Sequence, residues 1–311
     1  MPPFTRSKAA LAKPLPPSAA NTVFQTDDVY QLILGLLNIR QLAQLRRASR
    51  LANRDVHQFL RSRVHKYTLP FFSSAELRDK FFHYLDIWKS LVVGSVPLAA
   101  LSMPSNPPVP DNMNVIATFD KYFRWMHAMQ YVLDFTVVYE GECGEEYARV
   151  GFRYVTFRNN TSLDKLVTIT FSNRPHLWEL WFSAPHPYQW NAISGRSLIC
   201  PNVVATSRQV SIVGWPNRSH NMYKNIWCPS PFPGIVKVYA DTSNWPGACG
   251  WLCPGLIRAA QGLEGVGHWG WGGVDGDFEQ EDRLLTAFGR SQFTWKIATV
   301  CINPACSPAR K

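Results

Sequence analysis

One stretch, residues 89–120, constrains the fold of this chain more than any other. It opens with a short apolar run, residues 91–93, whose length suits a buried strand. Gly94 and Ser95 then interrupt that run before a short apolar helix and a proline-rich loop. Residues 112–118 follow and suit a second strand. This order of strand, Gly-Ser turn, helix and strand predicts an α+β fold.

The same order resembles the start of the nucleotidyltransferase fold, in which the Gly-Ser turn approaches a triphosphate. Two carboxylates on the next strand hold the metal there, because alternate strand residues share a face. Here those positions are Asn112 and Asn114, and the strand expected at 166–171 supplies no third carboxylate. The resemblance therefore implies a degenerate nucleotide pocket of Gly94, Ser95, Asn112 and Asn114. The backbone N–H groups of the turn could still bind an anion weakly in such a pocket.

Residues 24–68 predict a small helical module that follows a disordered tail at 1–23. Apolar residues recur there at helical spacing in three short stretches. The module resembles an F-box, which binds the Skp-type adaptor of cullin ubiquitin ligases, with Gln25-Thr26 in place of the usual Leu-Pro. An adaptor would then bind four leucines: Leu32, Leu36, Leu42 and Leu45. The alternative is a helical cap that packs on the next domain and exposes its arginines to solvent.

The chain also resembles a family of basidiomycete fungal proteins. Its members join an F-box-like segment to a nucleotidyltransferase-like domain and a cysteine-containing tail. Five pieces carry the resemblance: LVVGSVPLAAL, VPDNMNV, FDKYFRWM, LVTITFS and FSAPHPYQWNAISGRSLICPNVVAT. Family members usually have Asn-Asp-Leu-Asp where this chain has Asp111-Asn112-Met113-Asn114. The implied organisation is a mixed-sheet nucleotidyltransferase-like domain at 75–215 and an extension at 216–311.

Two cysteine pairs lie in that extension, Cys249 with Cys253 and Cys301 with Cys306. Paired thiolates can form a tetrahedral zinc site, and buried free thiols are the alternative. We expect no other cofactor. The glycine-rich run at 262–276 predicts a loop.

Further helices are predicted at 119–133, at 178–193 with interruptions at Pro185 and Pro187, and at 278–288, and a last strand at 294–300.

The net charge of +10 is unevenly distributed. Residues 1–66 carry 11 Lys and Arg against 3 Asp and Glu, whereas the rest carries 21 against 19. A nucleic-acid site needs such residues clustered on one surface, and a solvated helix face is the alternative. An odd number of cysteines, 7, without a signal peptide or a membrane span predicts a cytoplasmic or nuclear protein.

The leading interpretation is a non-catalytic interaction protein, a substrate receptor of a ubiquitin ligase. A nucleotide- or nucleic-acid-binding module is the second. An active metal-dependent nucleotidyltransferase is the third, because loss of two carboxylates removes most of the charge that such chemistry requires.

Overall fold

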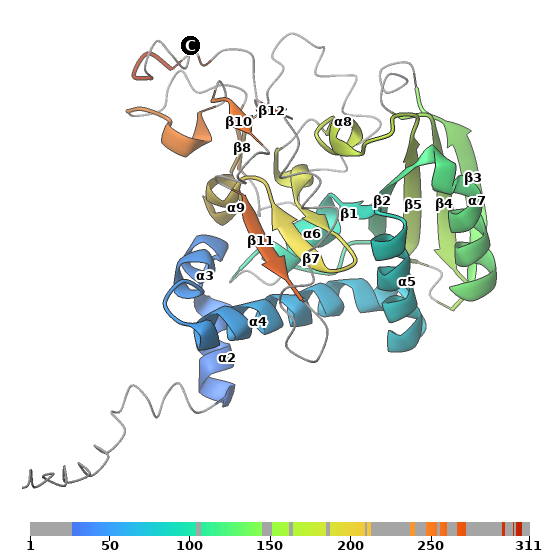
Figure 1. The fold of residues 1–311 in the computed structure, drawn as a ribbon, viewed down its shortest axis with the longest axis horizontal. Coiled ribbons are helices and arrows are strands. Elements are labelled where there is room, and N and C mark those ends of the chain that lie inside the picture. The colour runs from blue at the N-terminus through green and yellow to red at the C-terminus, as the bar shows by residue number, and fades with distance from the viewer. Residues whose placement is uncertain are drawn as a thin grey trace, which may run out of the picture.

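The computed structural model describes these parts of the chain: 27–103, 107–144, 151–161, 164–184, 187–208, 210–212, 237–239, 247–253, 256–259, 266–271, 294–295, 301 and 303–306. Together they form a mixed α+β fold around one eight-stranded sheet (Figure 1). In spatial order the strands are β11 (Gly267–Gly270), β7 (Ser197–Cys200), β6 (Ala192–Ile193), β1 (Leu91–Val93), β2 (Asn112–Thr118), β5 (Leu166–Ser172), β4 (Arg153–Asn159) and β3 (Phe135–Glu142). The α+β class and the strands predicted at 112–118 and 166–171 are confirmed, the latter with one further residue.

Strand pairing changes from antiparallel to parallel at β2. Strand β1 pairs antiparallel with both β2 and β6, whereas β2 pairs in parallel with β5. In this register Val93 lies opposite Asn114, and Asn114 lies opposite Thr168 on the other side. The turn at Gly94, which follows Val93, is thereby held beside the strand that carries the two asparagines.

Three helices begin the described part of the chain: α2 (Asp27–Leu36), α3 (Ile39–Leu45) and α4 (Arg50–Thr68). Asn38 lies just after the end of α2 and begins α3. Its side chain accepts a hydrogen bond from the Gln41 backbone N–H at 3.0 Å, and the Gln41 side chain accepts one from the Asn38 N–H at 2.9 Å. This reciprocal capping box satisfies two backbone donors that the first helical turn leaves unpaired.

Helix α4 packs on the sheet domain through α6 (Ser95–Leu101). The Arg63 guanidinium on α4 donates to the carbonyls of Ala100 at 2.7 Å and Ser102 at 3.0 Å. These carbonyls lie at the C-terminus of α6, where a helix lacks internal donors and favours positive charge. The N-terminal helices are therefore fixed to the sheet domain by polar contacts as well as by apolar packing.

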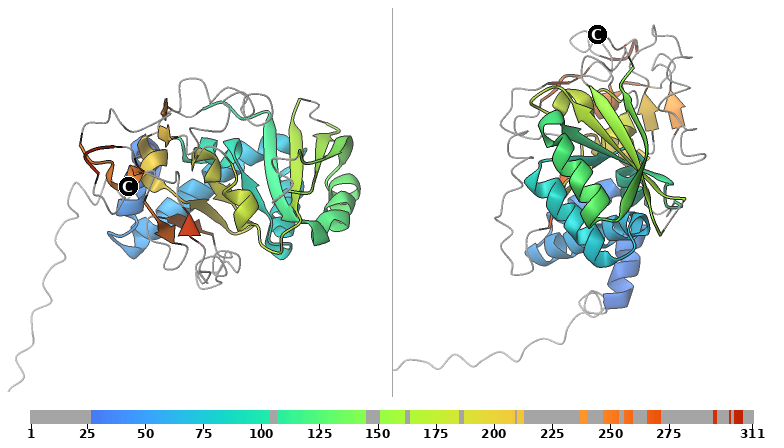
Figure 2. Two further views of the ribbon diagram at one scale, coloured as in Figure 1. Left: turned by 90° about the horizontal axis from the view of Figure 1, so that it is seen from above. Right: turned by 90° about the vertical axis from the view of Figure 1, so that its right-hand side faces the viewer.

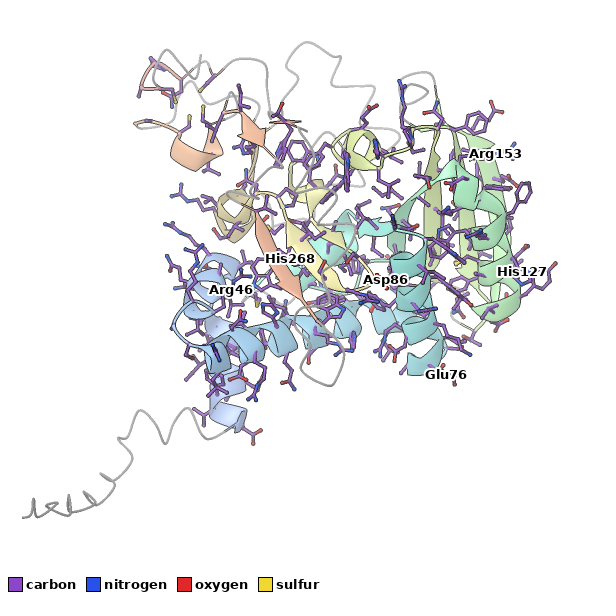
Figure 3. All side chains as sticks on the ribbon, viewed as in Figure 1. Arg46, Glu76, Asp86, His127, Arg153 and His268 are labelled. Atoms are coloured by element: carbon purple, nitrogen blue, oxygen red, sulfur yellow. The ribbon has the colours of Figure 1, made fainter. Side chains whose placement is uncertain are left out.

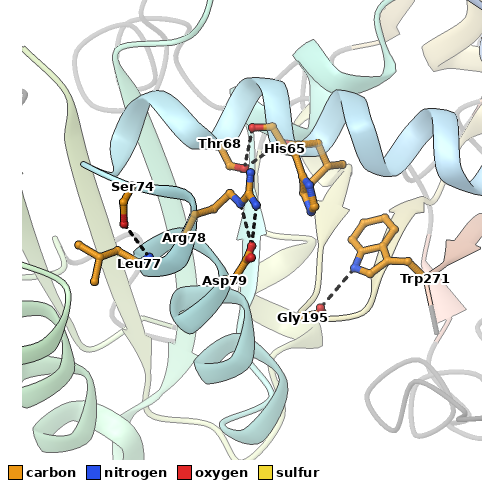
Figure 4. A network of polar contacts seen from close by, with 9 residues as sticks. His65, Thr68, Ser74, Leu77, Arg78, Asp79, Gly195 and Trp271 are labelled. Carbon is orange, nitrogen blue, oxygen red and sulfur yellow. Dashed lines mark hydrogen bonds and ion pairs between the residues drawn. The ribbon is translucent and has the colours of Figure 1, made fainter. Parts of the chain in front are cut away.

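Helices α5 (Ala75–Ile87) and α7 (Tyr122–His127) lie against one face of the sheet, as the right-hand view of Figure 2 shows. Ser74 caps α5, because its hydroxyl accepts from the Leu77 N–H at 3.2 Å (Figure 4). On the far side of α5, Gly195 comes so close that an added Cβ would lie 2.5 Å from Asp86 Cβ. Trp271 then donates from its indole N–H to the Gly195 carbonyl at 3.4 Å. Gly195 therefore contacts both α5 and Trp271, the residue that follows β11.

One apolar core runs from α2 to β11. It contains Leu34 of α2, Leu60 of α4, Phe157 of β4 and Trp269 of β11, and each of these side chains is fully buried. The odd-numbered residues of β2, such as Val115, point into it. The helical module and the C-terminal extension thus share a core with the sheet.

A second apolar cluster covers part of the opposite face. It includes Leu91, Ile116 and Trp181, the last from α8 (Trp178–Trp181). Beyond β2 the same face carries the half-buried hydroxyl side chains of Thr168 and Thr156. Strands β5 and β4 therefore present a polar surface there.

Several predicted elements differ from the structure. The glycine-rich run predicted as a loop contains strand β11, which pairs antiparallel with β7. The interrupted helix predicted at 178–193 contains α8 and a 3₁₀ turn (Pro187–Trp190), but it ends in strand β6. The helix predicted at 119–133 is divided into a 3₁₀ turn (Phe119–Lys121), α7 and a π-helical turn (Ala128–Val132).

The remaining elements are short. They are α9 (Val203–Arg208), a 3₁₀ turn (Gly250–Leu252), and the strand pairs β8 (Val210–Ile212) with β9 (Lys237–Tyr239) and β10 (Arg258–Ala259) with β12 (Thr294–Trp295). The predicted tail at 1–23, the helix at 278–288 and residues 296–300 of the last strand lie outside the described residues. Among the described helices, none combines the length and apolar character that crossing a membrane requires.

Candidate functional site

The four residues of the predicted nucleotide pocket lie together. Gly94 has φ +81°, a conformation that side chains disfavour, and it turns the chain from β1 into α6. A Cβ added to it would lie 3.4 Å from Asn114 Nδ2. The Ser95 hydroxyl donates to the Asn112 carbonyl at 3.3 Å. The Gly-Ser turn is therefore packed directly on β2.

The two asparagine side chains bind each other. Asn112 Nδ2 donates to Asn114 Oδ1 at 2.9 Å, so both amides lie on one face of β2. Thr168 on β5 donates to Asn112 Oδ1 at 3.3 Å, and its hydroxyl lies 3.1 Å from that of Thr156 on β4. The result is a row of neutral polar groups across three strands, which hydrogen-bond to one another.

The carboxylates near this row are occupied elsewhere. Asp111 is 85% exposed and accepts from Lys165 Nζ at 2.7 Å, while Asp120 forms an ion pair with Lys121. The place beside Asn114 on β5, where a third metal ligand would lie, is Thr168. Because a hard dication needs charged oxygen ligands to offset its dehydration, this row lacks the groups that bind magnesium.

One of the two backbone amides that were expected to bind an anion is already used within the fold. The Gly94 N–H donates to the Gln189 carbonyl at 3.2 Å, so this amide is already hydrogen-bonded within the fold. The turn is held against the segment before β6, and a phosphate would have to displace that contact.

The cysteine pairs do come together. The sulfurs of Cys249, Cys301 and Cys306 all lie within 4.8 Å of one another, and all three residues are buried. Cys249 Sγ lies 3.8 Å from Cys301 Sγ. Two sulfurs on one tetrahedral zinc ion with Zn–S bonds of about 2.3 Å are about 3.8 Å apart. Cys253 is fully buried in the same cluster but lies outside that mutual distance.

Donors surround this cysteine cluster. The Cys249 backbone N–H donates to Cys306 Sγ at 3.4 Å, and Asn303 Nδ2 donates to Cys249 Sγ at 3.2 Å. Arg258, only 6% exposed, donates to the Cys253 carbonyl at 3.3 Å. Burial lowers the pKa of Arg258 to about 10, and the nearby Cys253 thiol group opposes that shift. N–H donors and a cation both stabilise thiolates, so the cluster could hold a metal ion.

Two other described cysteines lie outside the cluster. Burial raises the pKa of Cys143 to about 11. Burial also raises the pKa of Cys200 to about 12, against the effect of a hydrogen bond to Thr206. Both remain protonated at neutral pH, unlike a metal-bound thiolate.

The four leucines of the predicted adaptor site do not form one surface. Leu32 and Leu36 on α2 are 70% and 72% exposed. Leu42 on α3 is fully buried in the main core, and Leu45 is half-buried against it. Val29, which was not in the predicted set, is 40% exposed. It lies three residues before Leu32, a helical spacing from which it could have been included.

No family model, curated protein or solved structure matches this chain. Function therefore has to be inferred from the side chains themselves.

Proposed function

We propose that this protein is a non-catalytic interaction protein of the F-box type, which binds a Skp-type adaptor of a cullin ubiquitin ligase through α2. The observation that carries this proposal is the exposed apolar row of Val29, Leu32 and Leu36. Residues spaced by three and seven positions lie on one side of a helix. An exposed apolar patch on an otherwise packed helix usually marks an interface.

Helix α2 is apolar on two sides. Its inner side is anchored by Leu34, fully buried, and Tyr30, 7% exposed, so the helix is already fixed to the core. The outer row is not needed for that packing. Covering each exposed leucine completely would contribute about 1.5–3 kcal/mol to binding before the costs of association. A preformed helix loses little conformational entropy on binding, so α2 could bind a protein partner at a low entropic cost.

The sheet domain would then serve as a pseudo-nucleotidyltransferase that presents or recruits a substrate. Its similarity to that fold rests on the strand, Gly-Ser turn, helix and strand order. Support for the lack of catalysis comes from the neutral row of Asn112, Asn114 and Thr168. A ubiquitin ligase subunit with free cysteines would work in the cytoplasm or nucleus.

Adaptor binding can be tested by a pull-down with a purified Skp-type adaptor. The double variant Leu32→Asp/Leu36→Asp should abolish capture, because two carboxylates would be desolvated in the interface. A matched control is Phe123→Asp, since Phe123 is 81% exposed but lies on α7. Absence of wild-type capture, or equal loss in both variants, would reject the adaptor proposal.

The alternative is a nucleotide- or nucleic-acid-binding module. It is favoured by the polar row on the half-covered face of the sheet, where Asn112, Thr168 and Thr156 are only half-buried. An active metal-dependent nucleotidyltransferase comes third. Incubation with magnesium or manganese and labelled nucleoside triphosphates separates it from the other two, because only an enzyme would transfer label.

We also propose that the cysteine cluster binds one structural zinc ion through Cys249, Cys301 and Cys306, with Cys253 as the fourth ligand. Zinc with four sulfur ligands supplies folding free energy and no catalysis. The support is the convergence of three buried sulfurs from segments that are far apart in the chain. Metal analysis of the purified protein should give one zinc per chain, and a metal-free folded protein would reject the proposal.

A further inference from the structure

A cavity of about 300 Å³ lies between α3, the turn before α9, β10 and β11. The residues of its wall that matter here are Arg40, Arg46, Arg47, Asn202, Arg258 and Trp269. None of the described residues that line it is acidic. It uses neither the asparagine row nor the exposed row on α2.

Three of the arginines come from one short helix and its end. Arg40, Arg46 and Arg47 form no ion pair with any residue in the described part of the chain. Arg46 is the most constrained, because its Nη1 donates to the carbonyl of His268 on β11 (Figure 3). Burial and the charge of Arg47 lower the pKa of Arg46, which indicates that positive charge is crowded here. An anion would relieve that repulsion.

Two buried donors belong to the same wall. Asn202 is 6% exposed, and Trp269 is fully buried. Within the described residues, neither Asn202 Nδ2 nor Trp269 Nε1 has a hydrogen-bond partner. The Asn202 amide cannot simply be flipped, because its Oδ1 accepts from the Ala205 N–H at 3.0 Å and thereby caps the start of α9. A buried donor without an acceptor costs about 1–3 kcal/mol, so a ligand oxygen that came within reach of either donor would recover that cost.

We propose that this cavity binds a small molecule that carries a pyrophosphate group. Guanidinium groups match phosphate oxygens in paired hydrogen bonds, and phosphate oxygens accept but do not donate. One phosphate monoester carries a charge of about −1.5 to −2, so three or four arginines are matched by two linked phosphates. The cavity also has an apolar wall, which suits a ring attached to the phosphates and is formed by Val203, Val204 and Val266.

Calorimetric titration of the full chain tests this, with inorganic pyrophosphate and ATP as separate probes at constant ionic strength. Binding of both would mean that phosphates suffice, and binding of ATP alone would mean that the apolar wall contributes. Either result supports the site. If neither probe binds at about 1 mM, the proposal is overturned.

Two variants decide whether the binding is at this cavity. Arg47→Gln should weaken binding about tenfold or more, since a hydrogen bond to a charged group is worth about 1.5–3 kcal/mol. Arg50→Gln is the matched control, because Arg50 is also exposed and only three residues away but does not line the cavity. Equal weakening by both would indicate non-specific attraction and overturn the proposal.

Asn202→Asp gives a second, independent test. Aspartate keeps the oxygen that caps the Ala205 N–H, so α9 should remain intact. It replaces the unpartnered donor with a negative charge, and affinity should therefore fall at least as far as in Arg47→Gln. Unchanged affinity in a folded Asn202→Asp protein would show that the phosphates bind elsewhere.

Discussion

The asparagine row and the cysteine cluster both bring potential metal ligands together, but only the cluster can supply negative charge. Asn112 and Asn114 are two residues apart on one strand, and their amides bind each other at 2.9 Å. Cys249 and Cys301 are 52 residues apart, and their sulfurs lie 3.8 Å from each other. The difference shows that convergence of side chains does not by itself make a metal site.

What surrounds each group reinforces the difference. The oxygens of the asparagine row accept from neutral N–H and O–H groups, as expected for amides. The sulfurs of the cluster accept from a backbone N–H and from Asn303, and a buried arginine lies nearby. Each of the following experiments would break or sharpen this contrast.

The largest effect should come from Cys301→Ser. Loss of one thiolate should remove the zinc and lower the free energy of unfolding by about 3 kcal/mol or more. Metal analysis and thermal unfolding would measure both. Cys143→Ser, outside the cluster, should keep the zinc and change stability by no more than about 0.5 kcal/mol. Equal losses in the two variants would remove the case for a metal.

A smaller effect is expected when charge is restored to the strand. Asn112→Asp/Asn114→Asp should lower stability at neutral pH by about 2 kcal/mol, because two carboxylates would share one face without a cation. Their mutual repulsion raises the pKa of one of the two aspartates in the folded state above its unfolded value. The double variant should therefore be more stable at low pH and lose stability as the pH rises through that pKa. Unfolding titrations over pH would record this.

The same double variant should still lack nucleotidyl transfer with magnesium or manganese, since β5 supplies Thr168 in place of a third carboxylate. Asn114→Asp alone serves as the control and should lose less stability. Transfer above background in the double variant would show that the two missing carboxylates alone separate the asparagine row from a metal site.

Gly94→Ala should cost about 1–2 kcal/mol, because φ +81° is strained for any residue with a Cβ. A Cβ there meets its nearest neighbour only at 3.4 Å, so strain and not collision sets the cost. Gly35→Ala, in α2 with open space around it, should instead stabilise by about 0.5–1 kcal/mol. Chemical denaturation measures both, and zinc content should not change.

The smallest effect is that of a chelator on Cys143. Its raised pKa of about 11 keeps it protonated, so alkylation at about pH 8 should be slow with or without chelator and should accelerate only as the pH approaches that pKa. The cluster cysteines should become reactive once zinc is removed. Mass spectrometry of alkylated peptides distinguishes them, and a chelator-dependent Cys143 would contradict the assignment.

The local parts of this structure were predictable from sequence, and the long-range parts were not. The bounds of β2 follow from its apolar pattern, and the third helix begins at a typical capping residue, Ser49, whose hydroxyl accepts a hydrogen bond from the Ala52 N–H. Strand β11 was missed because glycine has little intrinsic preference for strands, whereas here pairing with β7 and burial of Trp269 decide the conformation.

The sites show the same division. The Gly-Ser turn and its asparagines are close in sequence, so their proximity could be foreseen. The arginine cavity could not, because its walls come from Arg40 and from Trp269, more than two hundred residues later. Only tertiary packing turns arginines that looked solvated into the lining of a cavity. The sequence signal was no more than the excess of basic residues near the N-terminus.

The contacts between α4 and β11 also set an order for folding. His57 Nδ1 lies 2.5 Å from the Gly270 carbonyl, a pair separated by 213 positions. During synthesis, α4 leaves the ribosome long before β11 exists, so the part of its surface that contacts β11 stays uncovered while more than half of the chain is made. Contacts of such sequence separation slow folding and leave surfaces open to misassociation. A nascent chain that stops before residue 266 would therefore depend on chaperones to protect its first helices.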